Sequence, residues 1–235
     1  MRYTLFVILA FMAISFMGCK DVAYKIPVPA SPTTYFPQTK GTSWKYRDSV
    51  YGLITDTVNV HGVRVDTLSF TITGTTTDFN SKVCYNASIV SRVYGGGGMA
   101  YYYAGSHVFA LYQSTPPWGF TIMQVMTDTA SVGYTWISNP SLVNVLNGYP
   151  VQTINTILEK NISRVVNGKM FSNVVHSSSN FQINKNGNGF QNIAHFDFYL
   201  AQGVGLIEKD VQYFGYINEV ETIIGYNIAP AANAK

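Results

Sequence analysis

The dipeptide Asn167-Gly168 lies between two runs, 161–166 and 169–175, that each alternate apolar and polar side chains. This arrangement predicts a tight β-hairpin, because Asn and Gly accept the positive φ that both turn positions require. A hairpin of this kind joins neighbouring antiparallel strands, so it commits this part of the chain to an antiparallel sheet. His61-Gly62 also lies between two alternating runs, and we expect a second tight turn there.

Strand-like runs recur along the rest of the chain. They are rich in β-branched and aromatic residues and are separated by Gly, Pro and Asn. Gly148 and Pro150 would interrupt a helical stripe in 141–160, but this stretch has room for one short helix. We therefore predict an all-β fold, a single antiparallel meander that forms a curved sheet, a sandwich or an incomplete barrel. The further runs are 68–73, 82–94, 108–113, 120–126, 190–200 and 216–228.

Charge is scarce in this sequence. Only 11% of the 235 residues are charged, against about 25% in an ordinary soluble domain, while 14% are aromatic. This composition excludes a disordered tail, a coiled coil and a charged helical bundle. The net charge is +3 and Lys and Arg form no cluster, so we expect no nucleic-acid partner.

The first residues, 1–18, have the pattern of a secretory signal. Arg2 precedes an apolar stretch of about 13 residues, which is shorter than the roughly 20 that cross a bilayer. A small residue directly before Cys19 is typical of a bacterial lipoprotein signal, so we expect Cys19 to be acylated and to anchor the chain in a membrane. The proline-rich stretch 19–40 is then an extended tether, followed by a β domain at 41–230 and a tail at 231–235.

Cys84 is the second of the two cysteines. Once Cys19 is acylated, Cys84 has no cysteine left with which to form an intrachain disulfide. Its surroundings are strand-like, so we expect a small buried apolar residue rather than a nucleophile.

Five spaced segments of the chain form a recognisable set: Tyr35-Phe36-Pro37, Gly41-Thr42-Ser43-Trp44-Lys45-Tyr46, Val132-Gly133-Tyr134-Thr135-Trp136, 166–175 and Tyr199-Leu200-Ala201-Gln202-Gly203-Val204-Gly205-Leu206-Ile207. Together they resemble a group of β-rich envelope lipoproteins of Bacteroidota. The resemblance implies a lipoprotein of the cell envelope and brings no catalytic residues. Lys20-Asp21 is similar to the charged tag that follows the cysteine of such lipoproteins, so we expect an outer-membrane location, on the periplasmic or the surface face.

Two of these segments also have a physical interpretation. Alternation places Trp44 and Tyr46 on one face of a strand and Lys45 on the other, so a buried Trp–Tyr pair would anchor the strand. Gly203 and Gly205 share a face, which indicates a bulge or a close approach of backbone at a bend of the sheet.

His195, Asp197 and Tyr199 are two residues apart on a predicted strand, so they share one face. As a metal site this strand supplies two ligands, and His107 or His176 would have to complete it. The alternative is a polar strand face with one hydrogen-bonded His–Asp pair. We expect no metal and no cofactor, and we keep all three residues as candidates for ligand binding. The opposite, core-facing side would carry Phe196, Phe198 and Leu200.

Tyr101, Tyr102 and Tyr103 follow the glycine run Gly95-Gly96-Gly97-Gly98. Tyrosine combines apolar area with a hydroxyl and is enriched in recognition surfaces, so these residues are candidates for ligand binding. The alternative is a strand in which Tyr102 points inward and the other two are half-exposed.

Catalytic signatures are missing from this sequence. No Gly-x-Ser-x-Gly elbow is present, and we expect the late pair Glu219 and Glu221 to face solvent rather than a cleft. We therefore assign no catalytic residue and expect non-catalytic binding of an apolar ligand, a carbohydrate or an envelope protein. A structural or assembly lipoprotein is the second hypothesis, and a hydrolase that uses His195 and Asp197 is the third.

Overall fold

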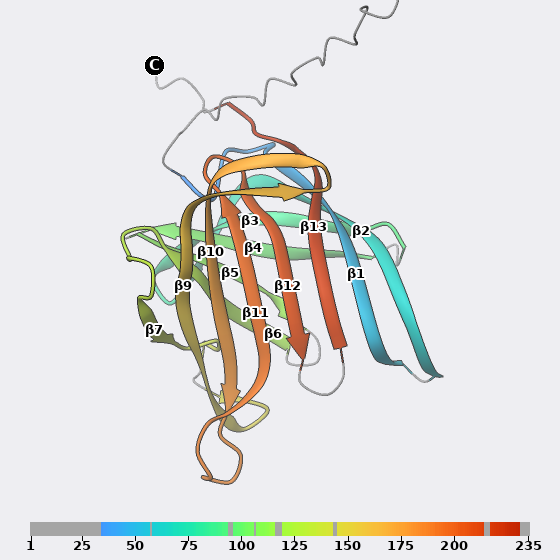
Figure 1. Cartoon of the computed structure of the whole chain (residues 1–235), viewed down its shortest axis with the longest axis vertical. Helices are drawn as coiled ribbons and strands as arrows, with labels where there is room; N and C mark the ends of the chain where they lie inside the picture. Colours follow the sequence, from blue (N-terminus) through green and yellow to red (C-terminus); the bar gives the residue numbers. More distant parts are fainter. Residues whose placement is uncertain are drawn as a thin grey trace, which may run out of the picture.

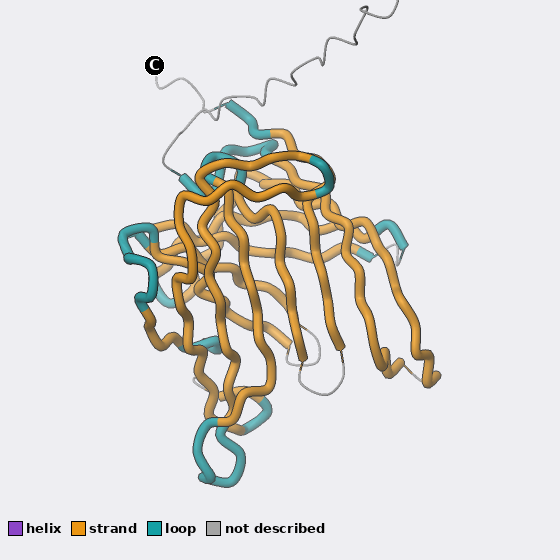
Figure 2. The backbone as a smooth tube through the Cα atoms, in the orientation of Figure 1, coloured by secondary structure: helices purple, strands orange, loops and turns teal. Residues whose placement is uncertain are grey.

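The computed structural model describes residues 34–56, 58–93, 96–105, 107–115, 119–142, 145–213 and 217–230. The signal segment, Cys19 and most of the expected tether lie outside these residues. None of the described residues forms a helix with the length and apolar character that a membrane span requires. Strands and loops make up the described chain (Figure 2). The strands are β1 (Ser43–Asp56), β2 (Val58–Phe79), β3 (Lys82–Ser91), β4 (Gly97–Gly105), β5 (Val108–Thr115), β6 (Gly119–Thr127), β7 (Thr135–Ser138), β8 (Val145–Leu146), β9 (Tyr149–Val166), β10 (Lys169–Ile183), β11 (Gln191–Ala201), β12 (Gly205–Tyr213) and β13 (Ile217–Asn227).

The strands form one antiparallel sheet. Their order in space is β6-β5-β4-β3-β2-β1-β13-β12-β11-β10-β9-β7, with β8 paired to β9 outside this path. Almost every strand pairs with its neighbour in sequence, and β1 pairs with both β2 and β13 near the middle of the sheet. The predicted all-β meander is therefore confirmed.

The sheet curves until its two ends approach each other. Figure 1 shows β9 to β13 with β1 in one layer and β3 to β6 behind them. A register shift in β2 between Ile72 and Thr76, where Gly74 has a φ of +84°, marks a bulge that bends the sheet. Near the far edges, the Ser177 hydroxyl donates a hydrogen bond to the carbonyl of Val125, which links β10 to β6. The result is the nearly closed form of an incomplete barrel.

Aromatic side chains fill the space between the layers. The Trp44 ring stacks on Tyr102 with 5.6 Å between centroids, and Phe36 meets Tyr102 edge to face at 5.3 Å. Trp44 and Tyr46 are buried and Lys45 is exposed, as alternation predicts. Tyr35 and Phe36 were expected in the tether, but both are buried in this core, so the folded domain includes residues before Gly41.

The hairpin predicted at Asn167-Gly168 is confirmed. Val166 pairs with Lys169, and the two turn residues have φ values of 49° and 77°. Both values lie in the left-handed region, which the two-residue turn requires.

The turn predicted at His61-Gly62 is wrong. Both residues lie within β2, where His61 is opposite Leu53 and Gly62 is opposite Gly52. The ladder continues to the pair Asp56 and Val58, so the strand passes through the expected turn. Alternation on both sides of a His-Gly pair is also what one long strand produces.

The stretch 141–160 contains no helix among its described residues. Its first part carries β8, and residues 149–160 belong to β9. Within β9 the buried side chains recur at every second position, which is the period of a strand and not of a helix. The expectation of a short helix here is therefore wrong. The buried residues are Val151, Thr153, Asn155 and Ile157.

Two of the segments that resemble the Bacteroidota lipoproteins meet in the core. The Trp44 indole N–H donates a hydrogen bond to the Val204 carbonyl at 2.6 Å, and the Tyr46 hydroxyl donates one to the Leu206 carbonyl at 2.8 Å. Gly205 has a φ of +108°, and a Cβ there would lie 3.3 Å from the indole nitrogen. The predicted close approach is confirmed, and these residues have a structural role in joining β1 to the start of β12.

Candidate functional site

Two polar clusters lie on opposite faces of the sheet. The first, here called the outer ladder, runs across β9, β10 and β11 and contains residues that the sequence singled out. The second, here called the inner acidic cluster, lies between the layers on β1, β12 and β13. The outer ladder is Glu159, His176, Asn180, His195, Asp197 and Tyr199, and the inner acidic cluster is Asp48, Glu219 and Glu221, with Lys209 beside them.

The outer ladder follows from strand alternation in β11. Phe196 and Phe198 are buried in the core, so the side chains between and beside them point to the other face. There, His195 is opposite Asn180 and Tyr199 is opposite His176 in the register of β10 and β11. The shared face predicted for His195, Asp197 and Tyr199 is confirmed.

Asp197 joins two imidazoles in the outer ladder. One carboxylate oxygen lies 2.8 Å from Nε2 of His176, and the other lies 3.1 Å from Nε2 of His195. The second nitrogen of each ring is also engaged, with Glu159 at 3.0 Å and Asn180 at 2.8 Å. Of the two histidines considered as a third ligand, His176 is therefore the one that lies beside His195 and Asp197.

The other candidate histidine, His107, lies elsewhere, where its Nδ1 is 2.8 Å from an oxygen of Asp128. These two residues follow β4 and β6 and take no part in the outer ladder.

Two carboxylates hold a proton on His176. Burial lowers the pKa of His176, but the hydrogen bonds to Asp197 and Glu159 more than offset this effect and leave its pKa raised. Burial raises the pKa of Asp197, yet the two imidazoles outweigh it, so the pKa of Asp197 is lowered. The pairing therefore favours the imidazolium form of His176 and the carboxylate form of Asp197.

The ring of Tyr199 is covered on both faces. His176 stacks on it with 4.2 Å between centroids, and the Arg164 guanidinium lies 3.4 Å from the ring centre. Two groups at these distances must occupy opposite faces of the ring. Arg164 is held in place by two hydrogen bonds to Glu208, at 2.6 and 2.8 Å. A sugar therefore has no free face of Tyr199 on which to stack.

The three consecutive tyrosines alternate between two cores. Tyr102 is buried against Trp44, whereas Tyr101 and Tyr103 are partly buried against a smaller cluster on the other face of β4. That smaller cluster contains Cys84, which is buried as expected, and burial raises the pKa of its thiol to about 11. This is the inward and outward pattern that the sequence offered as the alternative to a recognition surface.

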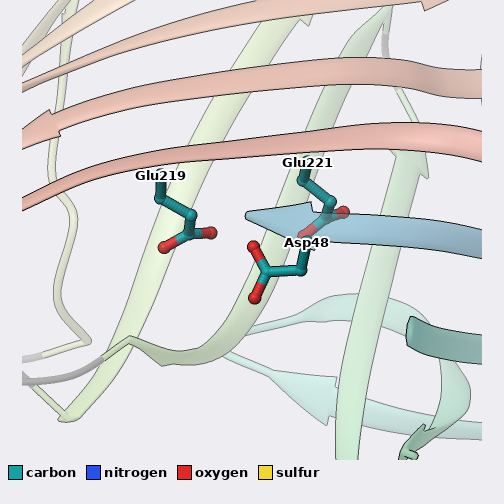
Figure 3. A group of neighbouring side chains, drawn as sticks. All are labelled: Asp48, Glu219 and Glu221. Carbon is teal, nitrogen blue, oxygen red and sulfur yellow. The ribbon is translucent and has the colours of Figure 1, made fainter. Parts of the chain in front are cut away.

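The inner acidic cluster forms where β1 and β13 place three acids in register beside Lys209 of β12. Asp48 is opposite Glu221, and Glu221 is opposite Lys209. Single ligand oxygens of Asp48, Glu219 and Glu221 all lie within 4.8 Å of one another, and Figure 3 shows the three carboxylates close together. Lys209 is buried and its Nζ lies 2.7 Å from Glu219 and 3.0 Å from Glu221.

The pKa of the Asp48 carboxyl is strongly raised. Burial and the charges of Glu219 and Glu221 raise its pKa to about 7, although Lys209 and Arg64 act in the opposite direction. Burial lowers the pKa of Lys209, but the two glutamates more than offset this and raise it well above its ordinary value. The ammonium is therefore a permanent charge, whereas Asp48 gains and loses a proton near neutral pH.

Glu219 and Glu221 share one face of β13, as predicted. The expectation that this face is exposed to solvent is wrong. Glu221 is buried and Glu219 is mostly covered, because this face of β13 looks into the space between the layers. Asp48 has the same parity along β1 as Trp44 and Tyr46, so strict alternation would have placed it in the core.

Comparison with known proteins identifies the fold. No protein-family model and no curated protein matches this chain. A candidate lipoprotein from Parabacteroides distasonis is 13% identical and superposes with a TM-score of 0.50, over 84% of this chain and 100% of its own. A candidate exported protein with a YmcC-like fold from Bacteroides fragilis is 8% identical, with a TM-score of 0.49 over 83% of this chain and 99% of its own. The match to the Parabacteroides protein shows a shared fold.

Proposed function

We propose that this chain is a lipoprotein of the bacterial cell envelope, anchored in the outer membrane through acylated Cys19, and that its β domain binds a partner protein without catalysis. Three features of the sequence support the anchor: the short apolar segment, the small residue before the cysteine and the proline-rich stretch after it. A solved structure that shares this fold comes from a candidate lipoprotein of Parabacteroides distasonis.

The outer ladder supports binding over catalysis. A general base needs a free nitrogen within hydrogen-bond reach of the proton that it removes. Both ring nitrogens of His176 and both of His195 already face oxygen or amide partners at 2.8 to 3.1 Å. This geometry stabilises five strand side chains against one another and argues against the hydrolase hypothesis.

The packed interior favours a binding site on the outside of the domain. The chain's own aromatic side chains, among them Trp44, Tyr46 and Tyr102, occupy the space between the layers and contact one another. An apolar ligand would have to displace these side chains to enter. A partner protein on the outer surface requires no such change.

The observation that carries the proposal is a row of exposed apolar side chains on the outer face of β1, β2 and β3. Val63 is opposite Tyr51 in the register of β1 and β2, and Val65 continues the same face of β2. Ser69, four residues further along this face, pairs with Val90 of β3. The exposed fractions are 63% for Val63, 42% for Val65 and Tyr51 and 56% for Val90. Exposed apolar side chains gathered on one surface are typical of an interaction site.

Two cations border this row. Lys45 and Arg47 are exposed on the same face of β1 as Tyr51. A complementary partner would therefore present an apolar surface with carboxylates at its edge.

Substitution of Val63 by Asp tests the proposal. Val165 is the matched control, because it is 60% exposed on β9, outside the row. The wild-type chain, Val63→Asp and Val165→Asp are each isolated from the native host after chemical cross-linking, and their melting temperatures are compared first. We expect one envelope protein to cross-link to the wild type and to Val165→Asp, and to be reduced at least tenfold with Val63→Asp. Equal cross-linking by all three chains, or none by the wild type, would contradict the proposal.

The anchor is tested separately by the intact mass of the protein purified from the native membrane. We expect a chain that begins at Cys19 and carries acyl groups. An unmodified cysteine, or a chain that still contains residues 1–18, would contradict the lipoprotein assignment and leave the partner surface to be judged on its own test.

A further inference from the structure

The inner acidic cluster brings three carboxylates together beside one buried ammonium. Asp48, Glu219 and Glu221 supply ligand oxygens within 4.8 Å of one another. Lys209 contacts one oxygen of each glutamate, Oε1 of Glu219 and Oε2 of Glu221. Each glutamate has a second carboxylate oxygen besides the one that contacts the ammonium.

Asp48 provides an observation that is independent of this clustering. Only 8% of the residue is exposed, and its Oδ1 is buried with no hydrogen-bond partner. Figure 3 shows its carboxylate directed toward the two glutamates. Buried carboxylate oxygens are normally hydrogen-bonded or bound to a cation, because an unpaired one loses its solvation without compensation. The unsatisfied oxygen is therefore open to a positive ligand.

The charges around Asp48 also favour the binding of a cation. The three carboxylates have two cations near Asp48, Lys209 and Arg64, so the group is short of one positive charge when all members are ionised. A divalent ion would more than supply this missing charge, and all three carboxylates could bind to it.

Carboxylate oxygens are ligands of calcium, which accepts six to eight of them in flexible geometry at about 2.3–2.6 Å, so two oxygens on one ion can be about 5 Å apart. Oxygens within 4.8 Å of one another therefore lie within reach of one calcium ion. Magnesium demands near-ideal octahedral geometry at about 2.0–2.1 Å and loses its water reluctantly, so calcium is the better match to an all-protein carboxylate site. We propose that Asp48, Glu219 and Glu221 form a calcium-binding site between the layers of the domain, with water completing the coordination.

The first test measures calcium binding by the full-length chain in mild detergent after removal of metal with EDTA. Carboxylate sites of extracellular proteins bind calcium with Kd values of about 10⁻⁴–10⁻³ M. We expect isothermal titration calorimetry with CaCl₂ to show one site in this range. We also expect 10 mM CaCl₂ to raise the melting temperature by about 3–10 °C above the value in NaCl of equal ionic strength. MgCl₂ at the same concentration should have a smaller effect.

Variants then locate the site. Asp48→Asn should weaken calcium binding at least tenfold, and Glu219→Gln, at a more exposed position, supplies a second ligand variant if the first folds poorly. Asp210→Asn is the matched control, because it removes a carboxylate from β12 next to Lys209 but on the opposite face, where Asp210 pairs with Asp197. Each variant is compared with its own metal-free melting temperature.

The variants distinguish binding at this site from a general effect of calcium. Calcium binding that is lost in Asp48→Asn or Glu219→Gln and kept in Asp210→Asn supports the proposal. No calcium effect beyond that of ionic strength, or an effect that persists in both ligand variants, overturns it. The inference does not depend on the partner surface, so its failure would leave the proposed function unchanged.

Discussion

Asp48 should make the metal-free protein less stable as the pH rises through the neutral range. The folded chain holds the pKa of Asp48 at about 7, whereas an unfolded chain returns it to 3.8. The folded state therefore binds this proton more tightly than the unfolded state. Between about pH 4 and pH 7 the stability that the proton provides is lost as the pH rises. Asp48→Asn keeps the shape of the side chain and removes this titration.

The size of the effect follows from the pKa difference. A difference of about three pKa units, at 1.36 kcal/mol per unit, gives an upper value of about 4 kcal/mol above pH 7. Asp48 is only 8% exposed, so solvent screening reduces this value little. We therefore expect a gain of about 2–4 kcal/mol at pH 8.

Equilibrium unfolding in urea with EDTA present measures this gain. We expect the free energy of unfolding of Asp48→Asn to match that of the wild type within about 1 kcal/mol at pH 4.5 and to exceed it by about 2–4 kcal/mol at pH 8. The comparison at pH 4.5 is the internal control, because both side chains are then uncharged in the folded state. A difference that is the same at both pH values would refute the assignment of a raised pKa to Asp48.

Three further substitutions test the packing of charge and aromatic side chains. Lys209→Met leaves the buried carboxylates without their ammonium and should lower the free energy of unfolding by about 3–5 kcal/mol in urea titrations, and a loss below about 1 kcal/mol would contradict the buried pairing. His176→Gln should cost more stability at pH 6 than at pH 9, because a histidine whose pKa is raised on folding contributes below its ordinary pKa and loses that contribution as the pH rises; equal losses would oppose this. Trp44→Phe removes the hydrogen bond to the Val204 carbonyl and should cost about 1–3 kcal/mol in the same assay, with an unchanged stability as the refuting result.

Local sequence signals identified those parts of the fold that depend on short-range geometry. Asn167-Gly168 predicts its hairpin because the two φ values are a property of the turn itself. The shared face of His195, Asp197 and Tyr199 follows from the period of a strand, which is independent of the rest of the fold. These predictions needed no knowledge of which strands pair.

Features of the fold that depend on pairing with distant strands could not be predicted from local sequence. His61-Gly62 has the composition of a turn, but pairing with β1 carries the strand past it. Gly148 and Pro150 obscured the strand period of β9, whose buried face is set by contact with the rest of the sheet. Where the local preference of a segment is weak, tertiary contacts determine whether it forms a turn, a helix or a strand.

The inner acidic cluster could not be predicted from local sequence for the same reason. Its acids come from β1 and β13, strands that lie at opposite ends of the sequence and side by side in the sheet. A pair of glutamates on one strand face is normally solvated, and only the closure of the sheet converts that face into an interior. The parity of Asp48 with Trp44 and Tyr46 was the one local signal of its burial.

The central functional claim is that a partner occupies the outer face of β1, β2 and β3 in the cell. A photo-cross-linking amino acid at position 63, with position 165 as the control, tests this directly in living cells of the native host. We predict that position 63 forms one dominant cross-link to a different envelope protein and that position 165 does not. Equal cross-linking at both positions, cross-linking only between copies of this chain, or none at position 63 would contradict the claim.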